Sequence, residues 1–457
     1  MFKAHMTFFY FFICLLQTLL APFIIILSKM LPFTRKRLIF ERRNLTDPAC
    51  QSFAKNHIKA SVAFEVSSEG ELEQIRPLLI KELNNQKKVE LIYCSESVES
   101  KCQKLYEQFP HLIRLYRLPL LSFSFIAVAN LQHIFHFITA DQLVLCRYDL
   151  YPELMLFGLL KTKKFVLVSA TLKNKKLRPF LYKLLYQAIF DQFDLILCAT
   201  KSDENKFKNI LNIEKHKLQV YDFRVVQILS RVENASNVLE SKIFYPLFKE
   251  WYAAVPHNHR IIFGSIWPLE MSIFKNSQFI EEIKSNRIKC VLAPHKLSKD
   301  FLTEIIQNVP ASLPYYVISK EMDLNACQTI FLSLTQKPGI LILTVPAILC
   351  ELYTSAGNAF VGGGHGRSIH SVLEPYVGMC KVFCGPKTHR STEYDLIKDY
   401  STNQIHVVTN LEDFSKIFMD NYMEDVDIIN RKHIFNEFND KFETVSDQIL
   451  SKQAEYV

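Results

Sequence analysis

Short apolar runs of strand length alternate with longer helical patterns along most of this 457-residue chain. This alternation is typical of α/β proteins, whose parallel strands are joined by helices that cover the sheet. The expected strands are residues 61–66, 89–93, 143–146, 165–168 and 195–198 in the first half, and residues 260–263, 288–292, 315–318, 340–343, 359–361 and 382–384 in the second. Helical patterns such as residues 70–86 and 175–190 separate them. The sequence therefore predicts an α/β fold with parallel sheets.

The two series of strands indicate two doubly wound domains. The chain length suggests two or three domains, and a hydrophobic content of 49% is sufficient for two cores. The expected divisions are a membrane anchor with a basic flank at residues 1–43, a first domain at 44–226, a linker at 227–259, a second domain at 260–400 and a mostly helical tail at 401–457. Doubly wound sheets bind ligands at the carboxyl ends of their strands. We therefore expect ligand binding in a cleft between the two domains.

The N-terminal segment predicts an association with a membrane. Residues 6–28 contain no charged side chain over 23 positions, and a spanning helix needs about 20. Pro22 lies inside this segment, which leaves a shallow, monotopic insertion open beside a spanning helix. Basic residues cluster between Lys29 and Arg43, which predicts that the rest of the chain is cytoplasmic. A cleaved signal peptide is the alternative, although the charge before the segment is low and cysteines are many.

The cysteine pattern and the net charge exclude several classes of protein. The eleven cysteines are scattered without a Cys-x-x-Cys pair or zinc-like spacing, which predicts buried free thiols in a reducing compartment. No acidic pair of the Asp-x-Asp type is evident as a metal site, so we expect neither a metal nor a cofactor. The net charge of +8 suits an anionic ligand or an anionic membrane surface. No nucleic-acid-binding motif occurs, so nucleic acid is not an expected partner.

Glycine is concentrated in one short segment. Seven of the eleven glycines lie between Gly357 and Gly385, and four of them fall within residues 362–366. The turn formed by Gly362, Gly363 and Gly364 follows an expected strand. Because glycine lets backbone N–H groups approach a ligand closely, this turn predicts phosphate binding. It matches neither the Walker loop nor the dinucleotide fingerprint, and a tight packing turn is the alternative.

Two polar side chains follow this turn. His370 and Glu374 are four residues apart, so on a helix they would share one face. An imidazole and a carboxylate would then meet the same ligand, and a carboxylate suits the two hydroxyls of a ribose. The alternative is an ordinary pair on the surface of a helix.

Two carboxylates follow strands in the first half. Glu71 lies in Ser67-Ser68-Glu69-Gly70-Glu71 after the first strand, where a general base is expected. Ser68 and Glu71 also have the spacing of a helix capping box, which is the alternative interpretation. Asp149 follows a later strand and is a candidate second acid of the site, with a surface salt bridge as the alternative.

Further candidates lie in the second half and in two basic stretches. Ser265 belongs to Gly264-Ser265-Ile266-Trp267-Pro268-Leu269-Glu270, whose tryptophan is either a ligand platform or a staple for the turn. After the next strand, His295 or Lys296 is a candidate phosphate contact, and a structural histidine is the alternative for His295. Residues 161–164 and 173–183 are basic, and they are either solvated faces or a surface for anionic lipid head groups.

These segments together resemble the Kdo transferases, the membrane-anchored enzymes that add 3-deoxy-D-manno-octulosonic acid (Kdo) to lipid A precursors. The resemblance covers roughly residues 60–400. Its motifs, in chain order, are Ser68-x-Gly70-Glu71, Gly264-Ser265-x-Trp267-Pro268-x-Glu270, Ala293-Pro294-His295, the run from Ala359 to Pro375, and Gly385-Pro386. The resemblance implies a GT-B fold, an inverting transfer from CMP-Kdo to a lipid A precursor in lipopolysaccharide biosynthesis, and a place at the inner membrane of a Gram-negative bacterium with the catalytic domains in the cytoplasm.

The resemblance also implies roles for individual residues. Glu71 corresponds to the proposed base, and Asp149 to a second acid that is more often glutamate. Glu374 corresponds to the carboxylate that holds the ribose, while His295 and the glycine turn would contact the CMP phosphate or base. The chain departs from the family pattern at Lys296, at Ser371 and in Ser169-Ala170-Thr171-Leu172, which lacks an arginine.

Two other functions remain open from the sequence. One is a GT-B transferase that uses a different nucleotide sugar, such as a UDP-hexose, on a lipid acceptor. The other is a membrane-anchored pseudoenzyme that binds a nucleotide or a partner.

Overall fold

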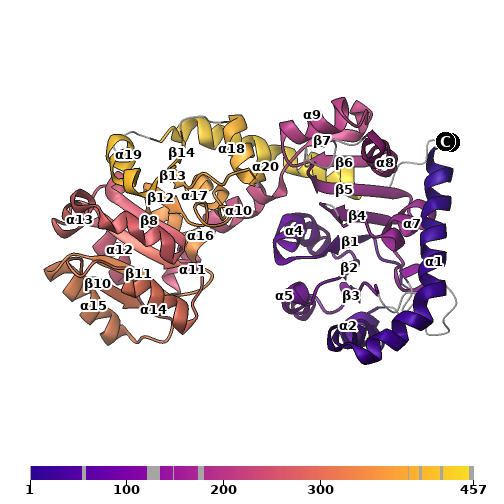
Figure 1. The fold of residues 1–457 in the computed structure, drawn as a ribbon, viewed down its shortest axis with the longest axis horizontal. Coiled ribbons are helices and arrows are strands. Elements are labelled where there is room, and N and C mark those ends of the chain that lie inside the picture. Colours follow the sequence, from indigo (N-terminus) through magenta and orange to yellow (C-terminus); the bar gives the residue numbers. More distant parts are fainter. Residues whose placement is uncertain are drawn as a thin grey trace. The chain divides into compact units, whose positions relative to one another are not determined.

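The computed structural model of the chain describes residues 2–53, 58–120, 134–147, 149–172, 180–389, 391–400, 404–422 and 426–451. The chain divides into two compact units (Figure 1). Unit 1 comprises Met1–Gln227 and Asn439–Val457, and unit 2 comprises Ile228–Phe438. Each unit contains one seven-stranded sheet, so the expected α/β architecture is confirmed.

The sheet of unit 1 is parallel throughout and has the strand order β3-β2-β1-β4-β5-β6-β7. Its strands are β1 (Val62–Val66), β2 (Val89–Tyr93), β3 (Ile113–Arg117), β4 (Gln142–Cys146), β5 (Lys164–Ala170), β6 (Leu195–Cys198) and β7 (Leu218–Val220). The first five are buried along their whole length. Burial on both faces is typical of parallel sheets covered by crossover helices.

The helices of unit 1 connect these strands and cover the sheet. They are α1 (Phe2–Met30), α2 (Pro32–Arg42), α3 (Pro48–Gln51), α4 (Glu69–Asn84), α5 (Glu96–Gln108), α6 (Ile134–Phe137), α7 (Pro152–Lys161), α8 (Phe180–Phe190) and α9 (Lys201–Asn209), with short 3-10 helices at Arg43–Leu45 and Lys215–Lys217. The helix α10 (Phe223–Glu233) begins in unit 1 and ends in unit 2. Figure 1 shows α4 and α5 on one side of the sheet and α7 on the other, with α1 beyond α7. Residues 173–179 of the expected helix and basic stretch lie outside the described residues.

The sheet of unit 2 is also parallel, with the order β10-β11-β9-β8-β12-β13-β14. Its strands are β8 (Arg260–Ile266), β9 (Lys289–Pro294), β10 (Tyr315–Ile318), β11 (Ile340–Leu343), β12 (Asn358–Val361), β13 (Lys381–Cys384) and β14 (Ile405–Val407). Its helices are α11 (Ala235–Glu240), α12 (Tyr245–Ala253), α13 (Ser277–Lys284), α14 (Lys299–Gln307), α15 (Leu324–Gln336), α16 (Leu349–Leu352), α17 (Leu373–Val377), α18 (Thr392–Tyr400), α19 (Phe414–Asn421) and α20 (Ile428–Leu450), with 3-10 helices at His257–His259, Pro268–Lys275, Tyr353–Ser355 and Leu411–Asp413.

Three strands were not predicted from the sequence. In β3, arginines alternate with apolar residues and hide the pattern of a buried strand. Arg114 is buried beside Glu90 at 3.3 Å, and Arg117 pairs with Asp47 at 2.7 Å and with Glu99 at 2.6 Å. Ion pairs that form only in the tertiary structure therefore allow these arginines to be buried in the strand. The other two strands, β7 and β14, are three residues long and lie at sheet edges. They are too short to show a hydrophobic pattern in the sequence.

The expected linker is a folded part of unit 2. Residues 227–259 consist mainly of α10, α11 and α12. Phe248, Trp251 and Tyr252 of α12 belong to a buried cluster that continues onto β9 and β11. Because three aromatic rings of this helix are buried in the core of unit 2, the segment is not a flexible linker. The second unit therefore begins at Ile228 rather than at residue 260.

The expected tail is divided between the two units. Arg431 of α20 is buried in unit 2, where it donates to the carbonyls of Tyr376 and Cys380 at 2.9 and 2.8 Å. Farther along the helix, Glu443 and Asp447 bind Lys81 of unit 1 at 2.6 and 2.8 Å. The end of the chain therefore completes the first unit.

The N-terminal helix α1 packs one stripe of side chains against unit 1. Met6, Tyr10, Cys14 and Thr18 are buried at a spacing of four residues, and Gln17 donates to Glu153 of α7 at 3.1 Å. Many other apolar side chains of the helix are exposed, among them Phe8, Phe9, Phe11, Phe12, Leu16, Leu19, Leu20, Phe23, Ile26 and Leu27. Within the described residues, none of the helices combines the length and apolar character needed to cross a membrane.

All eleven cysteines are buried free thiols, as expected.

Candidate active site

In each unit the candidate residues follow the two adjacent strands at which the order of the sheet reverses. In unit 1 these strands are β1 and β4, which are followed by Glu71 and Asp149. In unit 2 they are β8, which ends beyond Ser265, and β12, which leads into the glycine turn. Doubly wound sheets bind their ligands outside the carboxyl ends of strands at this reversal. The fold therefore gathers the predicted residues of each unit at the edge where ligands bind.

Glu71 lies in the first turn of α4 and is held there by its own loop. Ser68 caps the helix by accepting the N–H of Glu71 at 3.3 Å, and Glu71 Oε2 accepts the N–H of Ser67 at 2.8 Å. The capping interpretation is therefore correct, and it also orients the carboxylate. Burial raises the pKa of Glu71, the Ser67 N–H opposes that rise, and Asp149 adds to it. A carboxylate with a raised pKa is suited to accept a proton near neutral pH.

Asp149 is half-buried and follows a strained turn. Arg147, two residues earlier, has a left-handed φ of 64°, and its Nε donates to Gln74 Oε1 of α4 at 3.2 Å. Left-handed backbone at a non-glycine residue is uncommon and concentrates at functional sites. Asp149 is close enough to Glu71 and Glu65 to raise the pKa of both. It therefore belongs to a cluster of acids rather than to an isolated surface pair.

Glu65 was not predicted from the sequence. It is the last residue but one of β1, its side chain is fully buried, and its Oε1 accepts the hydroxyl of Ser67 at 2.9 Å. The available signal was a single acid in the otherwise apolar strand Val62–Val66.

The glycine turn of unit 2 is stabilised by a buried carboxylate. Glu270 Oε1 accepts the N–H of Gly363 at 2.7 Å, and its Oε2 accepts the N–H of Trp267 at 3.0 Å. Gly362 donates its N–H to Gly264 O at 2.9 Å. Two of the three predicted phosphate-binding amides are thus engaged within the protein. The packing interpretation holds for Gly362 and Gly363, and a bound phosphate would need other groups.

The close approach of β8 and β12 explains why these positions are glycine. A Cβ at Gly362 would lie 2.3 Å from the carbonyl oxygen of Ser265, and Gly363 has φ +101°. Ser265 itself has a left-handed φ of 55°, beside a register shift between β8 and β9. A Cβ at Gly364 would lie 2.6 Å from Gly385 Cα. The turn therefore packs against both β8 and the segment after β13.

His370 lies in the loop before α17, so the prediction that a helix places it on one face with Glu374 is wrong. The helix has only five residues and begins at Leu373. Instead, His370 stacks on His295 with centroids 4.1 Å apart, and its Nε2 accepts the indole N–H of Trp267 at 2.9 Å. Burial, with the neighbouring His295, lowers the pKa of His370 to about 4. It is therefore a neutral acceptor at neutral pH.

Two cations lie on the tryptophan of this stack. Trp267 also stacks on His295 at 4.6 Å, the Arg367 guanidinium lies 4.8 Å from its ring centroid and Lys296 Nζ lies 5.6 Å from it. Rings suit a planar base, and cations suit a phosphate or carboxylate. Trp267 therefore has the surroundings of a ligand platform, one of the two roles expected from the sequence. Lys296 was a candidate phosphate contact, whereas Arg367 was not predicted.

Glu374 is held by an arginine from the segment that was expected to be a linker. Arg231 donates to Glu351 through two bonds of 2.9 Å, and its Nη1 lies 3.4 Å from Glu374 Oε1. Ser371 Oγ accepts the N–H of Glu374 at 3.4 Å. The side chain of Glu374 is one-quarter exposed, so part of its carboxylate is accessible to a ligand.

Comparison with known proteins finds a family model that matches most of the first unit. Residues 35–222 match the family model described as 3-deoxy-D-manno-octulosonic-acid transferase (kdotransferase). The matched segment contains both Glu71 and Asp149. No curated protein matches the chain.

Solved structures resemble the chain at low sequence identity. A glycosyltransferase from Rickettsia africae is 12% identical, with 86% of this chain and 100% of that chain covered and a TM-score of 0.50. A UDP-GlcNAc 2-epimerase from Methanocaldococcus jannaschii is 11% identical, with 83% and 99% covered and a TM-score of 0.49. The C-terminal CMP-Kdo binding domain of WaaA from Acinetobacter baumannii is 15% identical, with 49% and 99% covered and a TM-score of 0.32. The Rickettsia likeness, together with the two parallel sheets, confirms the expected GT-B-type fold.

Proposed function

Because residues 35–222 match the Kdo transferase family model, we propose that this chain is a glycosyltransferase of that family, which moves Kdo from CMP-Kdo onto a lipid A precursor in lipopolysaccharide biosynthesis, with inversion at the anomeric carbon. The observation that carries the proposal is the pair of acids Glu71 and Asp149 at the carboxyl ends of β1 and β4, inside the matched residues. This pair offers a base in the place where a ligand is expected.

The proposed reaction has one displacement step. Glu71 accepts the proton of a sugar hydroxyl of the acceptor, whose oxygen forms a bond to the anomeric carbon of Kdo. The bond from that carbon to the phosphate oxygen breaks on the opposite face, and CMP leaves with the electron pair. Asp149 supports the charge that builds on the sugar as the bond to phosphate breaks.

The donor is proposed to bind unit 2. The stacked rings of Trp267, His295 and His370 suit the cytosine base, and the cations Arg367 and Lys296 suit the phosphate or the Kdo carboxylate. The accessible part of the Glu374 carboxylate suits the ribose hydroxyls. The engaged amides of Gly362 and Gly363 shape this site instead of binding the phosphate directly.

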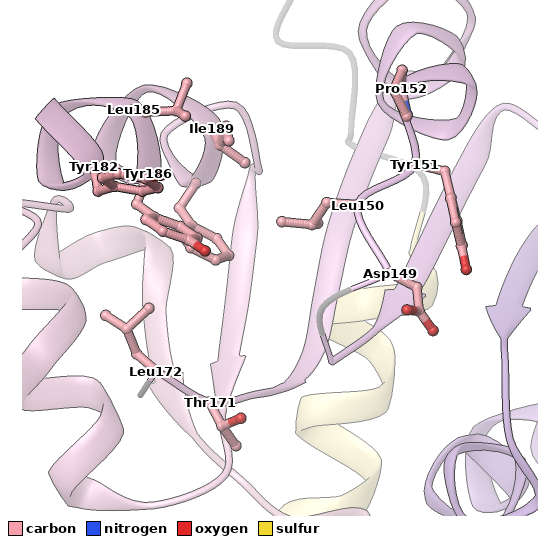
Figure 2. Close-up of a pocket in the computed structure, with 11 residues that line it drawn as sticks. Asp149, Leu150, Tyr151, Pro152, Thr171, Leu172, Tyr182, Leu185, Tyr186 and Ile189 are labelled. Carbon is pink, nitrogen blue, oxygen red and sulfur yellow. The ribbon is translucent and has the colours of Figure 1, made fainter. Parts of the chain in front are cut away.

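A cavity beside Asp149 supports a lipid-linked acceptor. Its volume is about 410 Å³, within the range of small-molecule sites. Figure 2 shows Leu150 pointing towards the side chains of α8, whereas Asp149 and Tyr151 point away from that wall. The apolar wall consists of Leu172, Tyr182, Leu185, Tyr186, Ile189 and Phe190. An apolar wall next to an acid suits a molecule that joins a hydrocarbon chain to a sugar hydroxyl.

The membrane association is proposed to be monotopic, at the cytoplasmic face of the inner membrane. The buried stripe of α1 packs on α7, and α1 also contacts α8, the wall of the cavity. Its exposed phenylalanines and leucines suit the apolar layer beneath lipid head groups, as in interfacial helices. The nearby basic residues Arg35, Lys36 and Arg42 suit anionic head groups.

The test is an in vitro assay of the full chain with CMP-Kdo and a tetraacyl disaccharide acceptor, read as product mass and CMP release. We expect transfer from CMP-Kdo and none from a UDP-hexose. Glu71→Gln is expected to lower transfer by about 10²–10⁴-fold while CMP binding is retained. The matched control is Glu153→Gln, a buried glutamate of α7 bound to Gln17. Transfer from a UDP-hexose alone, or full activity of Glu71→Gln, would contradict the proposal.

A further inference from the structure

A third carboxyl group lies beneath the two acids of unit 1. Glu65 comes from β1 and is fully buried. Its Oε1 accepts the Ser67 hydroxyl at 2.9 Å, and its Oε2 makes no hydrogen bond of normal geometry within the described part of the chain, although the backbone N–H of Cys146 lies near enough to the carboxyl to lower its pKa. A buried ionised carboxylate without full hydrogen bonding is costly, so such a group normally keeps its proton.

The electrostatic surroundings of Glu65 favour the same state. Burial raises the pKa of Glu65 well above its ordinary value, and the carboxylates of Asp149 and Glu71 raise it further. The Ser67 hydroxyl and the backbone N–H of Cys146 oppose this rise only in part. Repulsion among the three acids is therefore relieved by a proton.

The groups around Glu65 come from several elements. Glu71 belongs to α4, Asp149 follows β4, and Arg147 lowers the pKa of Glu71 from the same segment. The thiols of Cys94, after β2, and of Cys146, in β4, both face Glu65, and burial raises the pKa of each. Both are therefore neutral at neutral pH, which leaves the acids and Arg147 as the charged groups near Glu71.

Ser67 connects Glu65 to Glu71 and to the cavity. Its N–H donates to Glu71 Oε2 at 2.8 Å, while its hydroxyl contacts Glu65 Oε1 at 2.9 Å and Cys94 Sγ at 2.7 Å. Cys94 Sγ in turn contacts the hydroxyl of Tyr151 at 3.2 Å, and Tyr151 lines the cavity of Figure 2. A carboxyl, a hydroxyl, a thiol and a phenol thus form one chain of exchangeable protons from the buried acid to the cavity.

We propose that Glu65 is a positioning residue of the acceptor site, which fixes Ser67 beneath Glu71 and carries the proton that prevents all three neighbouring carboxyl groups from being charged together. Its catalytic effect rests on the proposed function, because it acts through Glu71. Its protonation and its contacts do not depend on the identity of the substrate. At high pH, Glu65 loses this proton, and its negative charge then repels the carboxylate of Glu71. The positions of Ser67 and Glu71 are disturbed, and the rate of transfer falls.

The first experiment measures transfer against pH for the full chain. The glutamine side chain in Glu65→Gln is neutral at every pH and can still accept a hydrogen bond from Ser67. We therefore expect roughly a threefold loss of kcat/KM at neutral pH. At alkaline pH, kcat/KM of the wild type is expected to fall, whereas that of Glu65→Gln is expected to stay constant. Glu65→Ala removes the support of Ser67, so we expect a loss of about tenfold or more. Glu153→Gln, the control outside the cluster, is expected to retain the wild-type profile.

The second experiment is independent of activity. Infrared spectroscopy of the wild type at neutral pH is expected to show a protonated carboxyl C=O band whose intensity is lower in Glu65→Gln and unchanged in Glu281→Gln, a variant of an exposed glutamate paired with Lys284. Absence of that decrease overturns the proposal even if transfer from CMP-Kdo occurs, and its presence supports the protonated state even if CMP-Kdo is not the donor. The proposal is also overturned if Glu65→Gln loses as much activity as Glu71→Gln at every pH. It is likewise overturned if both Glu65 variants keep the pH profile of the wild type.

Discussion

The N–H of Gly363 donates to Oε1 of the buried Glu270 at 2.7 Å. The other oxygen of this carboxylate accepts the N–H of Trp267 at 3.0 Å, so one side chain ties the loop after β8 to the loop after β12. These are the two strands at the reversal of the unit 2 sheet. Glu270 therefore determines the shape of the glycine turn without being a part of it.

Replacing Glu270 should destabilise unit 2 and weaken donor binding. Glu270→Ala leaves two buried N–H groups without an acceptor, and each costs about 1–3 kcal/mol. We expect this loss in the free energy of unfolding measured in urea, and weaker CMP binding by calorimetry. The control is Glu281→Ala, an exposed glutamate paired with Lys284, which should change stability by less than about 1 kcal/mol. Equal effects of the two variants would refute the structural role of Glu270.

The glycines of the turn should differ in their tolerance of alanine. A Cβ at Gly362 meets the backbone oxygen of Ser265 at 2.3 Å, whereas a Cβ at Gly366 finds only Leu269 Cδ2 at 4.0 Å. Overpacking of this kind costs about 1–3 kcal/mol, so Gly362→Ala should lower the thermal midpoint and Gly366→Ala should leave it nearly unchanged. A midpoint for Gly362→Ala as high as that of Gly366→Ala would show that β8 and β12 can separate.

The histidine stack should weaken as the pH falls. The pKa of His370 is lowered to about 4 in the folded protein and is about 6.5 when unfolded. The folded state therefore binds fewer protons between these values, so its stabilising contribution is complete above about pH 6.5 and is lost towards pH 4. His370→Gln should remove this part of the pH dependence of thermal unfolding.

Fluorescence offers a direct check of the same contact. Trp251 and Trp267 are the only tryptophans of the sequence, so Trp251→Phe leaves one reporter beside His370. Because a protonated imidazole quenches indole emission, we expect the signal to fall near pH 4. A midpoint at the ordinary histidine value would contradict the buried stack.

Glu374 should contribute to nucleotide affinity rather than to the chemical step. Glu374→Ala is expected to weaken CMP binding by about 10- to 150-fold, which corresponds to the loss of a charge-assisted hydrogen bond of roughly 1.5–3 kcal/mol. Glu351→Gln, which also touches Arg231, serves as the control for disturbance of that arginine. If the two variants bind CMP equally well, the carboxylate of Glu374 does not meet the nucleotide.

The exposed face of α1 should carry membrane affinity. Phe8, Phe12 and Phe23 are 71%, 56% and 71% exposed, and burial of each ring is worth about 1.5–3 kcal/mol. Their joint replacement by serine should abolish sedimentation with vesicles that contain anionic phospholipid, while Leu332→Ser, on an exposed position of α15, should not. Vesicle binding by the triple variant at the wild-type level would exclude this face.

Much of the fold could be predicted because local patterns specify it. The bounds of β2, β6, β10 and β11 were predicted exactly. For β6 and β11 the reason is that a strand buried on both faces is a continuous apolar segment. The capping spacing of Ser68 and Glu71 likewise predicted the start of α4 to within a residue. In contrast, β3 was missed because its arginines are neutralised by acids distant in the chain, and the helical residues 227–259 were mistaken for a linker.

The candidate site divides in the same way between local and distant information. By itself, the sequence determined which residues follow each strand, and therefore that Glu71, Asp149, the glycine turn and His295 would lie at the carboxyl ends of the sheets. Only the tertiary structure decided which of them share contacts: His370 with Trp267, Arg231 with Glu374, Glu270 with Gly363, and Glu65 with Ser67. The physical reason is that backbone pattern is set by neighbours in the chain, whereas hydrogen bonds and charge pairs are set by neighbours in space.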